Sequence, residues 1–376
     1  GCVPDEIVIV DLKDPVGLAS CCGRARLVLN CTGPYRFLGE FVVEACIAAR
    51  SHLMDLCGEP EFYDRVLLAH DDAARAAGVL IVHAAAWDSV PADIGTLLAT
   101  RHARDLGLLT QSVQVYHRFH EISVAHVTTF EAAVHGFASA SAGTLRRLRK
   151  DVARKFPRPP RQPHHRSLPQ RAFYWAKEHH AYAVKFMGSD VSVVRGSQRL
   201  LLAQNHPELC PPVSVFFLVE TTFGMLLVLI VGTLFSILAR FKWGRSLLLR
   251  YPEVFSLGFF THNGPSKKQL AQASFVTTIV PTCCPAKDPH AVPSTAHAAS
   301  VAIAGPEPGY VATPLLFLAM AHTLLEDLDV LPQQAGCVMP ASMVGDGPAL
   351  QGLVSRMIQG GIAVQTGIKF GANLGC

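Results

Sequence analysis

Short apolar runs alternate with helix-period patterns through the first hundred residues of the chain. The runs share strand length and a lack of polar alternation, and they lie at 6–11, 27–29, 51–55 and 79–83. This composition predicts strands that are buried on both faces. Between them, 39–49 and 61–77 repeat apolar residues at one-turn spacing, as amphipathic helices do. The alternation predicts an α/β fold with a parallel sheet and right-handed crossovers.

The turn Asn30–Arg36 follows the apolar run at 27–29. Gly33 supplies backbone freedom there, and Pro34 fixes one dihedral angle. A turn between a strand and a helix lies at the carboxyl end of a parallel sheet, where open sheets bind ligands. The turn therefore has two interpretations, a ligand-binding loop or a purely structural one.

A second turn precedes a further predicted helix. Gly78 is a predicted C-cap of the helix that ends before it, and Val79–His83 is the next strand. Asp88 or Ser89 can then cap a helix that has Pro91 in its first turn.

The pattern of apolar and polar residues changes beyond Leu106. Residues 112–119 alternate apolar and polar side chains, which predicts an antiparallel-type strand. Residues 146–171 then carry ten Lys or Arg residues, five prolines and a single acidic residue, Asp151. Such a block is typical of a solvated or disordered loop. The alternative is a binding segment for an anionic partner such as lipid head groups.

An uncharged apolar stretch, Thr221–Ala239, is followed at once by basic and aromatic residues that extend to Arg245. Its length and flanks suit a bilayer span or an inserted hairpin, but a buried core helix would have the same composition. A second apolar patch, Val254–Phe260, could return the chain to the same surface. The chain continues into an apolar helix at Leu315–Leu325 and ends in a weakly patterned tail, Gln359–Cys376.

Length, net charge, cysteine content and the number of apolar runs limit the classes of function to consider. The 376 residues suggest two domains, or one domain with a large insertion. A net charge of +4 is too small to indicate nucleic-acid binding. The 11 cysteines include no C-x-x-C pair, which favours reduced thiols in an intracellular protein over a disulfide framework or a metal site. A multi-spanning transporter would need several long apolar runs, and the chain has one.

No G-x-G-x-x-G motif occurs in the sequence, although a dinucleotide-binding sheet normally opens with one. If the sheet belongs to that class, its first βαβ unit is expected upstream of Gly1. The absence of an initial methionine also indicates that Gly1 is not the natural start.

Six blocks of sequence resemble the saccharopine dehydrogenase-like oxidoreductase family, and they occur in the family's order. They are V-L-N-C-T-G-P-Y-R-F-L-G-E at 28–40, D-L-C-G-E-P-E-F at 55–62, W-D-S-V-P-A-D at 87–93, F-M-G-S-D-V-S-V-V-R at 186–195, N-G-P-S-K-K-Q at 263–269 and G-P-E-P-G-Y-V-A-T-P at 305–314. The similarity runs from Ile7 to about Gly361.

The resemblance implies the remainder of a Rossmann-type NAD(P)-binding domain at 1–105, with NADP or NAD as cofactor. It implies an α/β substrate domain at 106–300, with the basic loop 146–171 and a membrane-leaning apolar insertion at 213–260. In 301–376, a helix would pack back on the first domain, followed by the weakly ordered tail. Distant relatives act as reductases in glycolipid synthesis or on saccharopine.

The resemblance also implies association with lipid droplets or another intracellular membrane on its cytosolic side, with the plasma membrane as an alternative. The expected partners are a small-molecule or lipid-linked substrate and a second copy of the chain in a homodimer. Two functions stay open. One is an NAD(P)-dependent oxidoreductase, and the other is an inactive membrane-attached protein that keeps the fold.

Site residues follow from the same resemblance. The nicotinamide ribose would face the turn that contains Asn30, Gly33, Pro34 and Tyr35. Asp11 would lie beside the adenine, and Ser89 would lie in a neighbouring cofactor-binding turn. The cofactor supplies hydride, and the protein supplies a proton donor. Asp88 or His126 is the candidate donor, and each has the alternative of a structural hydrogen-bonding role.

Two stretches depart from the family pattern. Ala84–Ala86 and Trp87 stand where relatives place glycine or serine and then phenylalanine. Val127–Thr129 stands where relatives carry a D-G-T-like turn, and the β-branched Thr128 would resist a positive φ there. Both departures bear on the cofactor and substrate sites.

Overall fold

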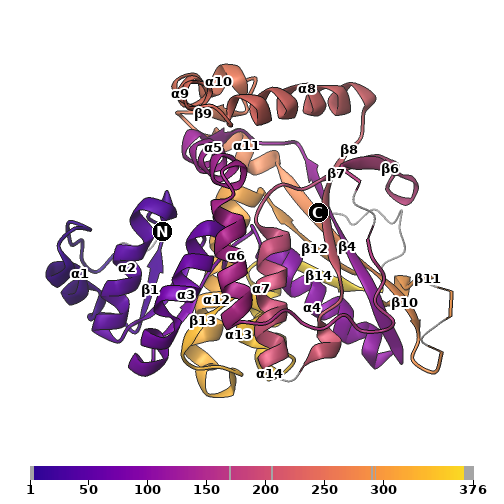
Figure 1. Ribbon diagram of the computed structural model, residues 1–376, viewed down its shortest axis with the longest axis horizontal. Helices are drawn as coiled ribbons and strands as arrows, with labels where there is room; N and C mark the ends of the chain where they lie inside the picture. Colours follow the sequence, from indigo (N-terminus) through magenta and orange to yellow (C-terminus); the bar gives the residue numbers. More distant parts are fainter. Residues whose placement is uncertain (1–3, 169–170, 205, 289–290, 293, 368–376) are drawn as a thin grey trace.

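The computed structural model describes residues 4–168, 171–204, 206–288, 291–292 and 294–367, and they form two sheets (Figure 1). A four-stranded parallel sheet has the order β1-β2-β3-β13. A larger mixed sheet has the order β14-β12-β10-β4-β8-β7-β6, with β11 beside β10. The predicted α/β class is confirmed.

The parallel sheet contains most of the elements predicted near the N-terminus. Its strands are β1 (Leu27–Asn30), β2 (His52–Asp55), β3 (Leu80–Val82) and β13 (Gly336–Val338). Its helices are α1 (Pro15–Cys22), α2 (Tyr35–Ala49) and α3 (Pro60–Ala77). Gly78 ends α3 with a φ of 70°, as its predicted C-cap role requires.

The strand predicted at 6–11 is wrong. These residues have no regular secondary structure, and Ile7 and Ile9 are 80% and 97% exposed. A strand needs a neighbour for its backbone groups, and no described strand pairs with this segment. β1 is consequently the edge of the sheet. Its Leu29 is exposed, so β1 is not buried on both faces as predicted.

The larger sheet is centred on β4 (Leu108–His120). β4 pairs antiparallel with β10 (Ser274–Pro285), which confirms the antiparallel character predicted for 112–119, and parallel with β8 (Val213–Val219). β8 therefore belongs to the sheet and not to the apolar insertion. The other strands are β6 (Phe173–Ala176), β7 (Ala181–Lys185), β11 (Ser294–Thr295), β12 (Val301–Pro306) and β14 (Ala363–Thr366). The tail predicted to be weakly ordered contributes β14, and 368–376 lie outside the described residues.

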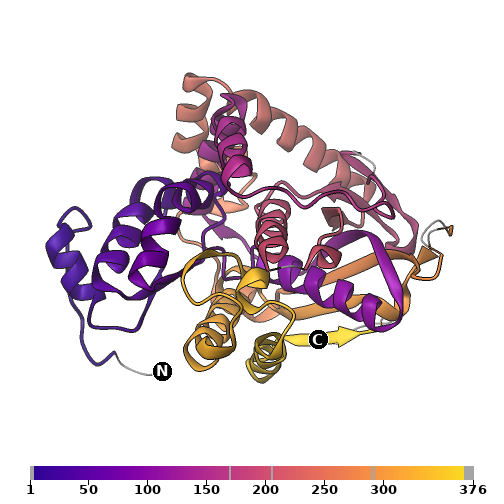
Figure 2. The same ribbon diagram turned by 60° about the horizontal axis from the view of Figure 1, so that its bottom comes forward.

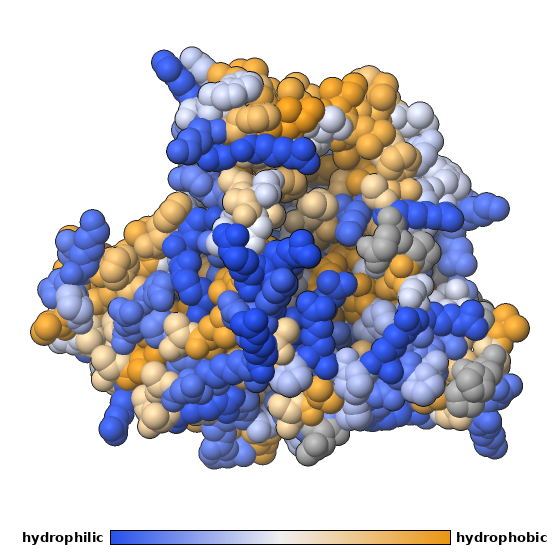
Figure 3. Space-filling model, in the orientation of Figure 1, coloured by the Kyte–Doolittle hydropathy of each residue, from blue (hydrophilic) through white to orange (hydrophobic). Residues whose placement is uncertain are grey.

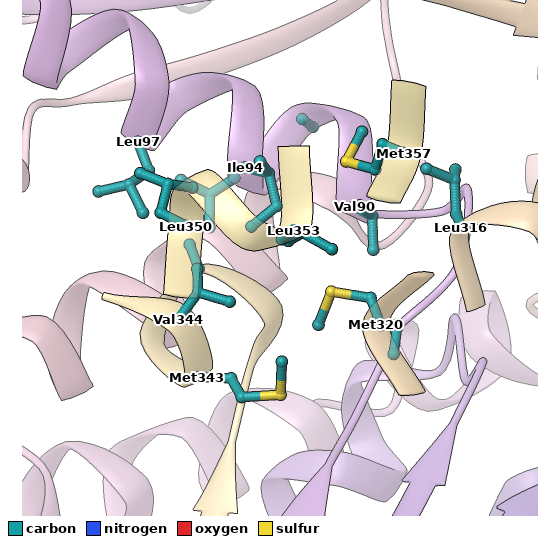
Figure 4. Close-up of a cluster of buried hydrophobic side chains, with 14 of the residues drawn as sticks. Val90, Ile94, Leu97, Leu316, Met320, Met343, Val344, Leu350, Leu353 and Met357 are labelled. Atoms are coloured by element: carbon teal, nitrogen blue, oxygen red, sulfur yellow. The ribbon is translucent and has the colours of Figure 1, made fainter. Parts of the chain in front are cut away.

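The main core lies where the two sheets meet, around α4 (Val90–Asp105). Figure 4 shows apolar side chains of α4 facing those of α12 (Thr313–Glu326), α13 (Pro340–Val344) and α14 (Pro348–Gln359). A Cβ on Gly95 would lie 2.5 Å from Ile279, so glycine lets α4 approach β10 closely. The C-terminal segment serves both sheets, since β13 joins the first and β14 joins the second (Figure 2).

A separate layer covers the upper edge of the molecule in Figure 1. Its elements are α5 (Val127–Ser141), α8 (Thr222–Leu238), α9 (Lys242–Arg250), α10 (Pro252–Phe255), α11 (Lys267–Gln272) and the small pair β5 (Ala125–His126) and β9 (Phe260–Thr261). Two further helices pack on the body: α6 (Thr144–Lys155) lies against α3, and α7 (Asp190–Ala203) lies against α4 and α13. The basic block therefore begins as a helix that buries Val152, and the predicted loop is present at 156–168.

The core-helix alternative for Thr221–Ala239 is wrong. Within α8 only Met225 and Leu238 are buried, and the remaining apolar side chains are wholly or partly exposed. α8 has 17 residues, fewer than a bilayer crossing usually needs. Among the described residues, one helical stretch is long and apolar enough to cross a membrane, Pro308–Glu326. It includes α12, and its Leu316 and Met320 are buried in the core of Figure 4.

Candidate functional site

The turn after β1 lies at the carboxyl-terminal rim of the parallel sheet, as predicted. Asn30, the last residue of β1, is buried, and its Oδ1 accepts a hydrogen bond from the Thr32 N–H at 3.0 Å. The Tyr35 hydroxyl donates to the Asn30 carbonyl at 2.8 Å across the cis Gly33–Pro34 peptide. The side-chain nitrogen of Asn30, Nδ2, is buried and has no hydrogen-bond partner. The turn thus presents one unused polar group.

Two acidic side chains tie this turn to those after β2 and β3. The Asp55 Oδ2 lies 2.7 Å from Nδ1 of His83, and its Oδ1 accepts the Ala84 N–H at 3.1 Å. Glu59 accepts the Tyr35 N–H at 2.8 Å and pairs with Arg36 at 2.5 Å. Since Tyr35 is the first residue of α2, the Glu59 carboxylate occupies the start of that helix.

Asp88 lies between these turns and the start of α7. Its Oδ1 accepts hydrogen bonds from Ser189 Oγ at 2.8 Å and from Ser89 Oγ at 3.2 Å. A Cβ added to Gly58 would lie 3.2 Å from Asp88 Oδ2, so the turn after β2 closes on the carboxyl group. Asp88 as a residue is half-buried, and its carboxyl group is enclosed by these contacts.

A buried polar chain continues from Asp88 into the larger sheet. Asp190, the first residue of α7, is a neighbour of Asp88, and its Oδ2 lies 2.7 Å from Nε2 of His117 on β4. The other ring nitrogen of His117 lies 2.8 Å from the Thr277 hydroxyl on β10. The ring centroids of Trp87 and His117 lie 5.2 Å apart. Both sheets therefore contribute to one site.

Burial sets the protonation of this chain. Burial, reinforced by the charge of Asp190, raises the pKa of Asp88 to about 8, although hydrogen bonds from Ser189 and Ser89 oppose the shift. Burial also raises the pKa of Asp190 to about 6 and lowers the pKa of His117 to about 4. Asp190 Oδ1 is buried and accepts no hydrogen bond from the groups present. A protonated Asp88 carboxyl group can donate a hydrogen bond to Asp190. At neutral pH the site therefore holds a neutral carboxyl group, a carboxylate and a neutral imidazole.

Most of the predicted cofactor-binding residues lie together, and two predicted site residues lie apart. Asn30, Gly33, Pro34 and Tyr35 form one turn, and the turn after β2 lies between it and the turn that holds Ser89. Ser89 occupies the N-cap position of α4, but its hydroxyl bonds to Asp88 and Ser189, so the predicted capping hydrogen bond is absent. Asp11 does not end a strand, and its exposed carboxylate accepts the Lys13 N–H at 2.9 Å.

His126 has a structural role in the described residues. Its ring accepts a hydrogen bond from the Thr128 N–H at 3.3 Å and thereby caps α5. The backbone N–H of His126 donates to the Tyr310 hydroxyl at 2.8 Å. No hydrogen bond or ion pair within the described ranges joins it to Asp88. Thr128 lies in the first turn of α5 and does not have a positive φ. The conflict expected between its β-branched side chain and a positive φ therefore does not arise. Ala84 does adopt a positive φ, 55°.

The sequence interpretation missed Asp55, Glu59, Ser189, Asp190 and His117. Ser189-Asp190 at the start of a helix and Asp55 at the end of a strand were visible signals within the blocks of family similarity. His117 had no comparable signal, because it is one polar position on an alternating strand. Only its contacts with α7 and β10 distinguish it.

A metal centre receives no support elsewhere on the described surface. Glu40, Glu44 and His70 place potential ligand atoms within 4.8 Å of one another. Glu40 already pairs with Arg65 at 2.9 Å and with His70 at 3.0 Å, so its negative charge is matched by protein groups. No disulfide joins the cysteines that the structure describes.

Comparison with known proteins places this site in context. No family model matches the chain. A human saccharopine dehydrogenase-like oxidoreductase is 34% identical over 343 residues, which cover 89% of this chain and 77% of the human protein. The rat protein of the same name is 32% identical over 361 residues, 95% of this chain and 81% of its own length.

A more distant relative is the lipid droplet localized protein of Caenorhabditis elegans, 29% identical over 349 residues, 90% of this chain and 80% of the relative. Among solved structures, apo saccharopine dehydrogenase (L-Glu forming) from Saccharomyces cerevisiae aligns with 95% of this chain and 88% of its own, at 11% identity and a TM-score of 0.47. The identity to the mammalian proteins extends over nearly the whole chain. On that basis, the chain belongs to the saccharopine dehydrogenase-like oxidoreductase family.

Proposed function

We propose that this protein is a nicotinamide-dependent oxidoreductase in which Asp88 donates the proton. The observation that carries the proposal is the polar chain Asp88–Asp190–His117, whose first member is a carboxyl group with a pKa of about 8. A general acid works best when its pKa lies near the operating pH. Asp88 meets that condition and lies after β3, at the rim where sheets of this type bind ligands.

The residues present fit one end of a nicotinamide dinucleotide. The orphaned Nδ2 of Asn30 could donate to a ribose hydroxyl or a carboxamide oxygen beside the cis Gly33–Pro34 turn. The described residues offer less to the diphosphate, because Glu59 already fills the start of α2 and no G-x-G-x-x-G motif is present. The cofactor, NAD or NADP, would supply hydride.

The protein's own part in the reaction is to hold and replace a proton. Ser89 and Ser189 orient the Asp88 carboxyl group by donating hydrogen bonds to its Oδ1. Burial keeps the proton on Asp88 at neutral pH, and Asp190 reinforces the effect because two adjacent carboxylates repel each other. His117 fixes Asp190 through a 2.7 Å contact and has its other nitrogen held by Thr277.

The proposed substrate is lipid-linked or derived from an amino acid, and the proposed location is a lipid droplet or membrane surface. The exposed apolar residues of α8 support this location; they are Phe223, Leu226, Leu227, Leu229, Ile230, Leu234 and Ile237. Figure 3 shows hydrophobic surface along this upper edge. Because α8 is short, we propose that it lies in the surface plane rather than crossing it.

The second candidate function is a membrane-attached protein without turnover. It is favoured by the occupied start of α2 and by Ala84, which holds a positive φ that glycine would adopt more readily. The two functions share the attachment surface and differ in cofactor binding.

Titration of the full-length protein with NADH and NADPH, followed by fluorescence, separates these functions. Saturable binding that Asn30→Ala weakens and Asn263→Ala leaves unchanged supports the oxidoreductase, since Asn263 lies on the exposed surface. Flat titrations with both nucleotides reject it. Attachment is tested by flotation with lipid droplets after Phe223→Ser and Ile230→Ser, which leave β8 intact. Undiminished flotation rejects the α8 surface.

A further inference from the structure

An open cleft of about 940 Å³ lies beside the corner where α8 ends and α9 begins. It separates the start of α2 and α3 from α5 and from the corner between α8 and α9. Its basic lining residues come from both sides and are Arg36, Arg65, Arg240, Lys242, Arg245 and His135. Glu61 is the one acidic residue among the lining residues that the structure describes. The cleft is therefore strongly positive.

The bases at its upper wall are not neutralised by protein carboxylates. Arg36 and Arg65 on the lower wall pair with Glu59 and Glu40. In the described structure, neither Arg240 nor Lys242 has a carboxylate within 4.0 Å, and Arg245 donates to the Ala239 carbonyl at 3.1 Å. Positive charge is thus available where α8 ends.

Two further groups in the cleft lack hydrogen-bond partners. The Ser139 hydroxyl on α5 is buried without one and lines the cleft. No side chain caps the start of α9, which begins at Lys242, a residue that lines the cleft. The first amide groups of a helix have no partner within the helix. Hydroxyl, amide and basic groups around one hollow are the donors that a phosphate group requires.

The corner that carries these bases has a fixed geometry. A Cβ on Gly244 would lie 2.2 Å from the Leu238 carbonyl oxygen, so α9 packs directly against the end of α8. Phe241 and Trp243 at the same corner are exposed, Trp243 by 63%. Exposed aromatic residues beside bases, at the end of an apolar helix, are typical of the membrane–water interface.

We infer that this cleft binds the phosphate group of an anionic phospholipid in the surface on which α8 lies. The inference rests on the proposed attachment and names the lipid chemistry that the attachment would select. Arg240 and Lys242 would provide the charge, and Ser139 and the start of α9 would provide the hydrogen bonds. A soluble phosphate, such as that of a nucleotide, shares this chemistry, so the test must separate the two sources.

The test measures flotation of the full-length protein with phosphatidylcholine vesicles that contain or lack phosphatidic acid. Arg240→Gln combined with Lys242→Gln should weaken binding to the anionic vesicles by about tenfold or more, because each base near an anionic surface contributes substantially. Lys13→Gln combined with Lys287→Gln removes the same charge from exposed residues outside the cleft lining and should change binding less than twofold.

Equal losses in the two double variants would overturn the cleft as a site, because they would indicate a diffuse charge effect. So would an unchanged affinity of the first variant. If that variant instead loses binding to NADPH or to inorganic phosphate while vesicle binding persists, the ligand is soluble and the lipid assignment is wrong. Failure of α8 attachment is distinguishable, since Phe223→Ser with Ile230→Ser would then leave flotation on neutral and anionic vesicles unchanged.

Discussion

The Asp190 carboxylate lies 2.7 Å from Nε2 of His117, and both side chains are only 1% exposed. The contact joins the first turn of α7 to the central strand of the larger sheet. It also fixes the carboxylate that faces Asp88 at the rim of the parallel sheet. The ionisation of Asp88 is therefore linked to the packing of the two sheets against each other.

Asp190→Asn should lower the pKa of Asp88. The substitution removes the negative charge that, after burial, contributes most to the raised pKa, while an amide can still bond to His117. Carbon-13 NMR titration of the Asp88 carboxyl group measures the change directly. Asp329→Asn, at an exposed position, is the matched control and should leave the titration in place. An unchanged Asp88 titration in the Asp190 variant would contradict the proposed arrangement.

Stability should fall as pH rises from about 7.5 to 8, and Asp88 should account for most of the fall. Its pKa is raised from 3.8 to about 8, so the folded state holds a proton that the unfolded state has already released. The stabilisation is complete below pH 3.8 and is lost as pH rises through the folded pKa. Asp64, Asp93 and Asp190 have pKa values raised to about 6 and are largely ionised in both states across this window.

The buried histidines do not interfere in that window. The pKa values of His117, His165 and His179 are lowered to about 4 from 6.5, so these groups are mostly neutral in both states above pH 7.5. Urea unfolding at several pH values should give a slope of at most about 1.4 kcal/mol per pH unit. Asp88→Asn should flatten it. A variant that keeps the full slope would show that another group controls the pH dependence.

Local periodicity accounts for the elements that sequence predicted well. β1, β2, β3 and α3 each carry their apolar pattern within a few consecutive residues, and Gly78 marks an end that only the local backbone decides. The segment at 6–11 has the same composition as a strand, yet strand formation depends on a partner elsewhere in the chain. The helical start of the basic block was missed because its only buried apolar contact is Val152.

The same distinction between local patterns and long-range contacts applies to the residues of the candidate site. The turns at Asn30–Tyr35 and Asp88–Ser89 were found because each follows its own predicted strand. The contact between Ser89 and Ser189 joins residues one hundred positions apart, and His117 reaches Thr277 across an even longer separation. Such contacts depend on how the two sheets pack, which local patterns do not encode.

Ala84→Gly should stabilise the protein by about 0.5–1 kcal/mol, because Ala84 holds a φ of 55° that a side chain disfavours. The bond from its N–H to Asp55 would remain. Thermal or urea unfolding measures the gain. Ala85→Gly, at an adjacent buried position without a positive φ, should destabilise instead. If both variants lose stability equally, the positive φ carries no measurable strain.

Gly244→Ala should destabilise the corner between α8 and α9 by about 1–3 kcal/mol, since its new methyl group would meet the Leu238 carbonyl, a backbone atom that cannot rotate away. Gly232→Ala is the matched control within α8. Nothing lies within 4 Å of its added Cβ, so that variant should gain up to about 1 kcal/mol from helix propensity.

Hydrogen exchange of the amides in 235–250 would locate the effect. Faster exchange there in the Gly244 variant, with slower or unchanged exchange in the Gly232 variant, is the expected result. Equal protection in both variants would mean that α9 does not depend on close contact with α8.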